Sequence, residues 1–114
     1  MKSQVDETLR ADVWNVGIID APIESLITSP SSPKIRWLPE PAPGRFVADP
    51  FGIETDDGIR VFAETIELCE DRGEIVSASL SSSGKLGDWR ECLSTTTHLS
   101  YPFIVQDGDT TWMI

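Results

Sequence analysis

Apolar and polar residues alternate along most of the chain, and Gly, Pro and Ser residues divide it into short segments. From residue 45 onward the alternation is of the kind found in β-strands that are buried on one face. Short turns join the segments, which indicates one antiparallel meander of four strands. The expected strands are residues 46–53, 59–66, 74–80 and 89–94.

The first part of the chain has a different pattern, because two proline clusters interrupt it. Residues 14–19 are apolar enough for a strand that is buried on both faces. Residues 20–34 contain three prolines and are expected to form a loop, followed by a short strand at 35–38. Residues 1–12 carry mixed charge and are expected to fray.

Asp-Gly pairs predict the two sharpest turns. Asp57-Gly58 separates two expected strands, and both residues tolerate the positive φ that a type I′ hairpin turn requires. Asp107-Gly108 has the same place between strands expected at 101–105 and 110–114. The second pair of strands therefore repeats the organisation of the first.

A short motif repeats as well. Asp49-Pro50-Phe51 is echoed 52 residues later by Tyr101-Pro102-Phe103, and each copy precedes an Asp-Gly turn and an apolar strand. This interval suits one blade of a β-propeller, since kelch blades repeat about every 50 residues. We therefore expect an all-β fold with about one and a half propeller blades, one at about 46–95 and the start of another at about 99–114.

The sequence ends at Trp112-Met113-Ile114, inside an expected strand. One blade and part of a second cannot close a ring, because repeats bury their faces only against neighbouring repeats. We expect the domain, at 13–114, to be the N-terminal part of a propeller, and the chain to be a fragment of a longer protein or a truncated gene product.

The net charge of −10 excludes whole classes of partner. Acidic chains repel the phosphates of nucleic acids and the surfaces of anionic membranes. No apolar run approaches the ~20 residues that span a bilayer, so no membrane contact is expected. The N-terminus lacks the apolar core of a secretory signal, which indicates a cytoplasmic location unless a leader has been removed.

Few side chains offer catalytic or ligating chemistry. Cys69 and Cys92 are too few for a zinc site or a disulfide framework, so they are either two thiols or one bridge. The sequence has no Gly-rich phosphate loop, no nucleophile elbow and no metal-ligand cluster. No cofactor and no metal are therefore expected.

Asp49 is the candidate catalytic residue. A proline restricts the residue before it to extended backbone, and the first strand of a propeller blade lines the central channel. The Asp49 carboxylate is therefore expected to point into a cleft. Glycoside hydrolysis uses two carboxyl groups that flank the scissile bond, and Asp49 could be one of them. The alternative is that Asp49 caps a turn, since Asp-Pro often begins one.

Three further residues are candidates for substrate binding. Tyr101 takes the place of Asp49 in the repeated motif, where it could stack on a sugar ring or fill the channel wall. His98, the only histidine, stands where the second blade begins, and Glu64 lies on the second expected strand. The alternatives are a structural histidine and a solvated glutamate.

Several segments, in this order and spacing, resemble the N-terminal domain of the glucosamine inositolphosphorylceramide transferase family. That domain is similar to the five-bladed propellers of family 43 glycoside hydrolases, and the resemblance covers about residues 14–114. The segments are Trp14-Asn15-Val16-Gly17-Ile18, Phe46-Val47-Ala48-Asp49-Pro50-Phe51, Val61-Phe62-Ala63-Glu64, Gly73-Glu74-Ile75, His98-Leu99-Ser100-Tyr101-Pro102-Phe103 and Trp112-Met113-Ile114.

The resemblance implies a carbohydrate, or another small molecule that contains a sugar, as the partner. In the hydrolases the Asp of the first-blade Ala-Asp-Pro motif is the general base, which is Asp49 here. Tyr101 stands where they have a second Asp, and their general acid comes from a later blade. The implied function is a glycan-processing or glycan-binding module of a larger transferase-like or hydrolase-like protein, with further blades or a transferase domain. The alternatives are a non-catalytic sugar-binding or scaffolding propeller, or an inactive truncated product.

Overall fold

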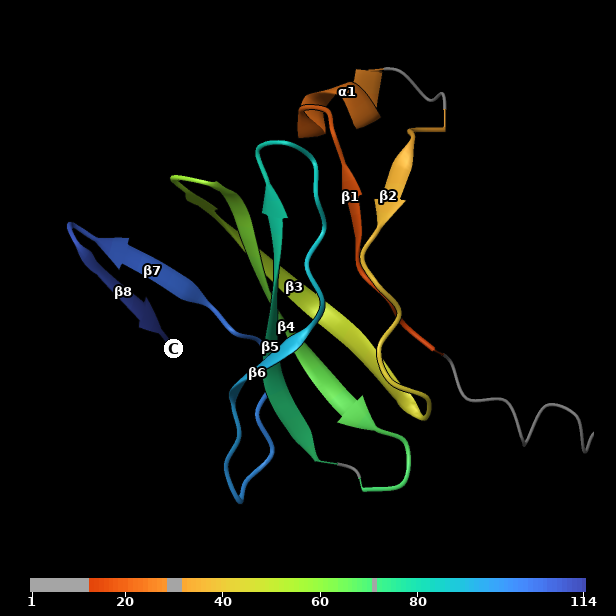
Figure 1. Cartoon of the computed structure of the whole chain (residues 1–114), viewed down its shortest axis with the longest axis vertical. Helices are drawn as coiled ribbons and strands as arrows, with labels where there is room; N and C mark the ends of the chain where they lie inside the picture. Colours follow the sequence, from red (N-terminus) through yellow and green to blue (C-terminus); the bar gives the residue numbers. More distant parts are fainter. Residues whose placement is uncertain (1–12, 29–31, 71) are drawn as a thin grey trace, which may run out of the picture.

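The computed structural model describes residues 13–28, 32–70 and 72–114 (Figure 1). Residues 1–12, which were expected to fray, lie outside the described ranges. Every strand pair within those ranges is antiparallel, which confirms the expected all-β class. The elements in chain order are β1 (Gly17–Ile19), α1 (Ile23–Thr28), β2 (Ile35–Trp37), β3 (Arg45–Thr55), β4 (Gly58–Glu67), β5 (Gly73–Ser81), β6 (Arg90–Leu93), β7 (Ile104–Asp107) and β8 (Thr110–Met113).

The central sheet is the four-stranded meander that the alternation predicts, with the strands in the order β3-β4-β5-β6. Strand β4 has five consecutive buried residues, at 61–65, because it lies between β3 and β5 and is covered on both faces. Its residues alternate between those faces, so Val61 and Ala63 point to one side while Phe62 and Glu64 point to the other.

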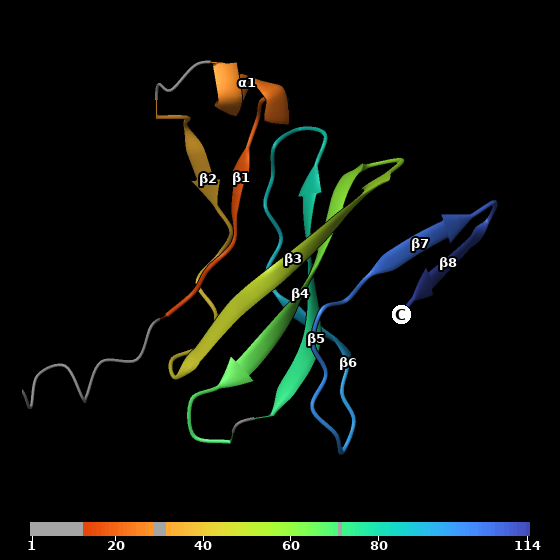
Figure 2. The ribbon, with the colours of Figure 1, turned by 180° about the vertical axis from the view of Figure 1, so that it is seen from behind.

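Each face of the central sheet carries its own apolar core. The β1–β2 hairpin covers one face and the β7–β8 hairpin covers the other, and Figures 1 and 2 show the two hairpins on opposite sides of the sheet. The buried core of the first face comprises Val16, Leu38, Val47, Val61, Ala63, Val76 and Ala78, and that of the second comprises Phe62, Ile75 and Ile104.

Hydrogen bonds fix the N-terminal hairpin to the sheet. The Val47 amide donates to the Trp14 carbonyl at 3.0 Å, so the chain before β1 runs beside the outer edge of β3. The Trp89 indole N–H donates to the Pro39 carbonyl at 2.9 Å. The first face is therefore closed by both polar and apolar contacts.

An ion cluster closes one end of the sheet on the same face. Arg45 on β3 pairs with Glu67 on β4 and with Glu74 on β5, both at 3.1 Å. The Ser94 hydroxyl, just after β6, donates to Glu74 at 2.8 Å, and Arg72 pairs with Glu74 at 3.2 Å. The Ser94 hydrogen bond, followed by Arg45, lowers the pKa of the Glu74 carboxyl.

Several local predictions were wrong. The strand expected at 14–19 with both faces buried is only β1, Gly17–Ile19, and none of its residues is buried. The expected loop at 20–34 contains the short helix α1, because Pro22 precedes the helix, where a missing N–H does no harm, and its carbonyl accepts from the Ser25 amide at 3.0 Å. The β3–β4 hairpin turns at Asp56-Asp57 rather than at Asp57-Gly58. Of the three residues at this turn, only Gly58 has a positive φ, at 140°. A Cβ at this position would collide with the Leu80 carbonyl.

Two further observations concern the cysteines and the length of the helix. Cys69 and Cys92 are both exposed and do not form a bridge. Within the described ranges, no helix is both long enough and apolar enough to cross a lipid bilayer.

Candidate functional site

The two copies of the repeated motif meet in space. Asp49, Pro50 and Phe51 on β3 and Tyr101, Pro102 and Phe103 before β7 line one hollow of about 140 Å³. The rings of Phe51 and Phe103 meet edge to face, with their centroids 5.2 Å apart and their planes at 72°. The two copies of the repeated motif therefore contact each other, one in the central sheet and the other directly before the C-terminal hairpin.

Asp49 and Tyr101 share an unusual backbone conformation. Their φ angles are 51° and 52°, and they are the only non-glycine residues with positive φ in the described part of the chain. L-residues adopt this region at a cost of about 1–3 kcal/mol, and such residues gather at functional sites. The expected extended conformation of Asp49 is therefore wrong.

A β-bulge explains the conformation of Asp49. Ala48 pairs with Glu64 and Phe51 pairs with Phe62, so Asp49 and Pro50 stand unpaired between two regular positions of the ladder. Pro50 has no N–H to give to the ladder, and a bulge is where a strand tolerates it. Bulges redirect side chains and are frequent beside active sites.

A tight turn sets the second copy of the motif. The Phe103 amide donates to the Tyr101 carbonyl at 2.7 Å, and Pro102 between them is buried. Strand β7 therefore begins at Ile104, three residues later than expected. The Tyr101 side chain is 72% exposed, whereas Asp49 is half-buried.

Glu64 lies on the same face of the central sheet as Phe51, and its side chain is buried. The residue is only 4% exposed, and both of its carboxylate oxygens have partners. The Ser100 hydroxyl donates to one oxygen, and the His98 Nε2 lies 3.2 Å from the other. A buried carboxylate requires such donors, since its desolvation is costly.

His98 has partners on both ring nitrogens. Its Nδ1 accepts a hydrogen bond from the Gly73 amide at 3.0 Å, so Nδ1 carries no proton. The proton of the neutral ring is therefore on Nε2, which lies 3.2 Å from a Glu64 carboxylate oxygen. With neither nitrogen left free, His98 in this arrangement cannot act as a general base towards a ligand.

Gly73 allows the segment around His98 to approach β5. The Leu99 amide donates to the Gly73 carbonyl at 2.9 Å. A Cβ on Gly73 would collide with the Leu99 carbonyl and would lie 2.8 Å from the nearer Glu64 oxygen. Only glycine fits this approach of the two backbones.

The four predicted site residues thus fall into two linked pairs. Asp49 and Tyr101 line the hollow, whereas Glu64 and His98 contact each other outside its lining. Sequence reasoning did not single out Ser100 for the site, although it lies inside the segment from His98 to Phe103 that was noted. No signal in the sequence marked its hydroxyl as the partner of Glu64.

The hollow suits a small amphipathic ligand. Its lining combines three aromatic rings, two prolines and a single carboxylate, that of Asp49. Aromatic faces bury apolar area, while one well-placed polar group fixes orientation. Within the described ranges, no group of three or more His, Cys, Asp or Glu side chains could hold a metal ion.

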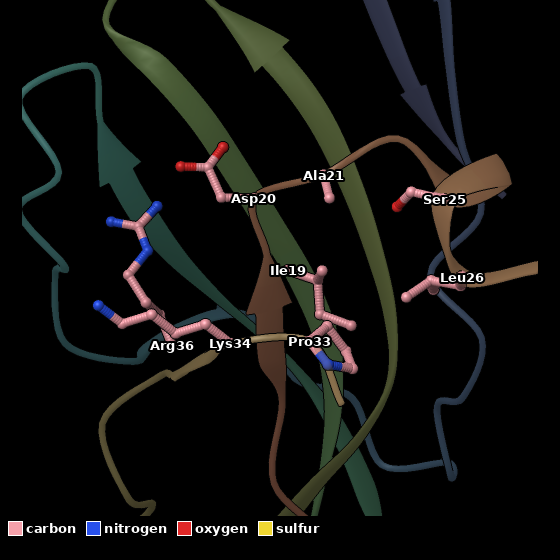
Figure 3. Close-up of a pocket in the computed structure, with 8 residues that line it drawn as sticks. All are labelled: Ile19, Asp20, Ala21, Ser25, Leu26, Pro33, Lys34 and Arg36. Carbon is pink, nitrogen blue, oxygen red and sulfur yellow. The ribbon is translucent and has the colours of Figure 1, made fainter. Parts of the chain in front are cut away.

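A larger hollow of about 500 Å³ lies between β1, α1 and β2 (Figure 3). Asp20 and Arg36 extend to the same side of it, and Ser25 and Leu26 come from the helix. None of the four predicted site residues lines it. This hollow therefore lies apart from the Asp49–Tyr101 site.

Comparisons of the chain with protein-family models, with curated proteins and with solved structures found no match. The chemistry of the described residues is therefore the main ground for assigning a function.

Proposed function

We propose that the chain is a glycan-binding β-propeller module of a larger carbohydrate-active protein, and that the Asp49–Tyr101 hollow is its sugar site. The observation that carries the proposal is the meeting of the two Pro-flanked motifs, which puts one carboxylate and an exposed tyrosine ring around a single hollow. The sequence resemblance to the N-terminal domain of the glucosamine inositolphosphorylceramide transferase family points the same way.

The layering of the sheets supports a propeller. A four-stranded antiparallel meander is the unit of a blade, and a blade packs against a neighbour on each face. Here the β1–β2 hairpin covers one face of the meander and the β7–β8 hairpin covers the other. The second copy of the motif leads into β7, at the place where a second blade would begin.

The chemistry of the hollow supports a sugar. A sugar ring presents apolar C–H faces and a rim of hydroxyl groups. The rings of Phe51, Tyr101 and Phe103 offer surfaces for the apolar face, and the Asp49 carboxylate can accept hydrogen bonds from hydroxyl groups. The strained backbone at Asp49 and Tyr101 holds both side chains in place before a ligand arrives, which favours affinity.

Binding is favoured over catalysis for this chain. Glycoside hydrolysis requires two carboxyl groups, and Asp49 is the only carboxylate in the lining of the hollow. In a parent protein that processes glycans, Asp49 would be the base that activates water or a sugar hydroxyl. The second carboxyl group would then come from outside this lining.

A titration of the full chain tests the proposal. Tyr101 is the only tyrosine, so ¹³C-labelled tyrosine gives NMR ring signals from this residue alone. Xylotriose, arabinotriose, cellotriose and glucosamine are added in turn. We expect at least one of them to shift the Tyr101 signals in a saturable way, and the Asp49→Asn variant to weaken that response.

The matched control is Trp37→Ala, which removes an exposed aromatic side chain on β2 that does not line the hollow. It should bind as the wild type does. If none of the four saccharides shifts Tyr101, or if Asp49→Asn and Trp37→Ala behave alike, the hollow is not the sugar site.

A further inference from the structure

We infer that Glu64 is a positioning residue for the Asp49–Tyr101 site, and that it acts through a clasp formed by Glu64, His98, Ser100 and Gly73. This role differs from the direct contact with substrate that the sequence suggested for Glu64. Its purpose rests on the proposed function, because the clasp matters for binding only if the hollow binds a ligand. The positioning itself can be measured in the free protein.

The clasp holds one short segment against the sheet at several points. Ser100 donates to Glu64, the Gly73 amide donates to the His98 Nδ1, and the Leu99 amide donates to the Gly73 carbonyl. The His98 Nε2 lies 3.2 Å from the second Glu64 oxygen. Three consecutive residues are thus bound by hydrogen bonds to β4 and β5. A free loop would have exchanged these bonds for bonds to water.

The clasp ends at Ser100, the residue before Tyr101. Pro102 is buried on the other side of Tyr101, and Phe103 packs edge to face on Phe51. Tyr101 is therefore held from both sides, while its own side chain is 72% exposed and contributes little to its placement. Its positive φ persists because its neighbours are fixed.

Glu64 is tied to the other half of the hollow too. It pairs with Ala48 across the β3–β4 ladder, directly before the bulge that carries Asp49. One buried residue thus connects to Asp49 through the ladder and to Tyr101 through Ser100. The distance between the two halves of the hollow depends on this connection.

The variants separate positioning from stability. Ser100→Ala removes one donor to Glu64 and leaves the fold's apolar cores unchanged, whereas Ser100→Thr restores a hydroxyl at the same place. Thr97→Ala is the matched control, because Thr97 lies in the same exposed loop and its side-chain hydroxyl contacts only Thr95. Glu64→Gln keeps an acceptor for His98 and a donor for the Ser100 hydroxyl, so it should retain the clasp in weaker form.

The experiment uses the full chain with ¹³C-tyrosine and ¹⁵N-histidine, since the chain has one residue of each kind. In the wild type we expect an imidazole with protonated Nε2 and unprotonated Nδ1, because the Gly73 amide donates to Nδ1. Ser100→Ala should move the Tyr101 ring signals in the absence of ligand and weaken saccharide binding about three- to tenfold, the loss typical of one side chain that must be ordered anew. Ser100→Thr should reverse both effects, and Thr97→Ala should show neither.

Two results would overturn the inference. One is a wild-type His98 that carries its proton on Nδ1, a measurement that needs no variant to fold. The other is a folded Ser100→Ala protein whose Tyr101 signals match those of Thr97→Ala. If Ser100→Ala moves Tyr101 while no saccharide binds the wild type, the positioning stands and the proposed function fails.

Discussion

Asp49 and Tyr101 stand 52 residues apart in the chain, yet they adopt the same left-handed backbone conformation and line the same hollow. Each directly precedes a proline and then a phenylalanine, and the two phenylalanine rings contact each other. The pair relates the central sheet to the C-terminal hairpin by local geometry as well as by sequence. The side chain at this place is a carboxylate in one copy and a phenol in the other.

Asp49→Gly separates the strain of this position from its chemistry. Glycine adopts positive φ without a Cβ penalty but loses more chain entropy on folding, so we expect a free energy of unfolding that is unchanged or raised by up to about 1 kcal/mol. Saccharide binding should be lost, because the carboxylate is gone. Urea denaturation and the tyrosine-detected titration measure the two quantities. A marked loss of stability would mean that the Asp49 side chain supports the fold.

Tyr101→Phe and Tyr101→Ala distinguish stacking from hydrogen bonding by the phenol. If the ring is the contact, Phe should retain most of the affinity and Ala should lose about tenfold or more, as aromatic contacts worth ~1.5 kcal/mol would require. Isothermal titration calorimetry with the saccharide that binds best gives both constants. Equal losses in the two variants would instead assign the contact to the hydroxyl group.

Gly73→Ala should destabilise the protein by about 2 kcal/mol or more. The added Cβ collides with the Leu99 carbonyl, so either β5 or the segment at 98–100 must move. Gly52→Ala is the matched control, because its Cβ would meet only Ile59 at 3.7 Å, an ordinary contact. The midpoints of denaturant unfolding compare the two, and similar midpoints would contradict the close approach at Gly73.

Phe51 and Phe103 should be coupled energetically. Their edge-to-face contact predicts a coupling free energy of about 0.5–1.5 kcal/mol in a double-mutant cycle of Phe51→Leu and Phe103→Leu. Leucine keeps much of the apolar volume, so the cycle isolates the interaction between the rings. Strictly additive effects on unfolding would show that the two copies of the motif do not support each other.

Glu74 should make stability depend on acid. Its pKa is lowered by the Ser94 hydroxyl and by Arg45, so the folded state favours the ionised carboxyl. Its contribution is therefore complete above the ordinary pKa of about 4.5 and is lost as the pH falls through the lower pKa of the folded state. Unfolding midpoints of the wild type should fall more steeply below this pH than those of Glu74→Gln. Parallel pH profiles would show that the ion cluster contributes nothing.

The sequence predicted the sheet because its signals are local. Alternation with a period of two and Asp-Gly turns located every strand of the meander, and the repeated motif indicated residues that meet in the structure. What it missed depended on partners from distant parts of the chain. Ser100 has no distinctive neighbours in the sequence, and its role arises only because β4 brings the Glu64 carboxylate within hydrogen-bonding distance of its hydroxyl.

Local sequence rules also failed to predict the backbone conformation at Asp49 and at α1. The residue before a proline usually takes extended backbone, and the conformation of Asp49 departs from this rule because a bulge gives the ladder a place for Pro50. The helix α1 formed where prolines predicted a loop, since the seven residues between Pro22 and the next proline are enough for one short helix.

The hollow lies between two separate sheets, since Asp49 belongs to the central sheet and Tyr101 leads into the β7–β8 hairpin. A ligand that touched both residues would therefore act as a cross-brace between the two sheets. By thermodynamic linkage, it would bind more tightly the more firmly the hairpin is docked, and it would in turn resist the hairpin's detachment. Ligand binding to the hollow and local opening of the C-terminal hairpin would then be coupled, so that a measurement of one would also give the effect on the other.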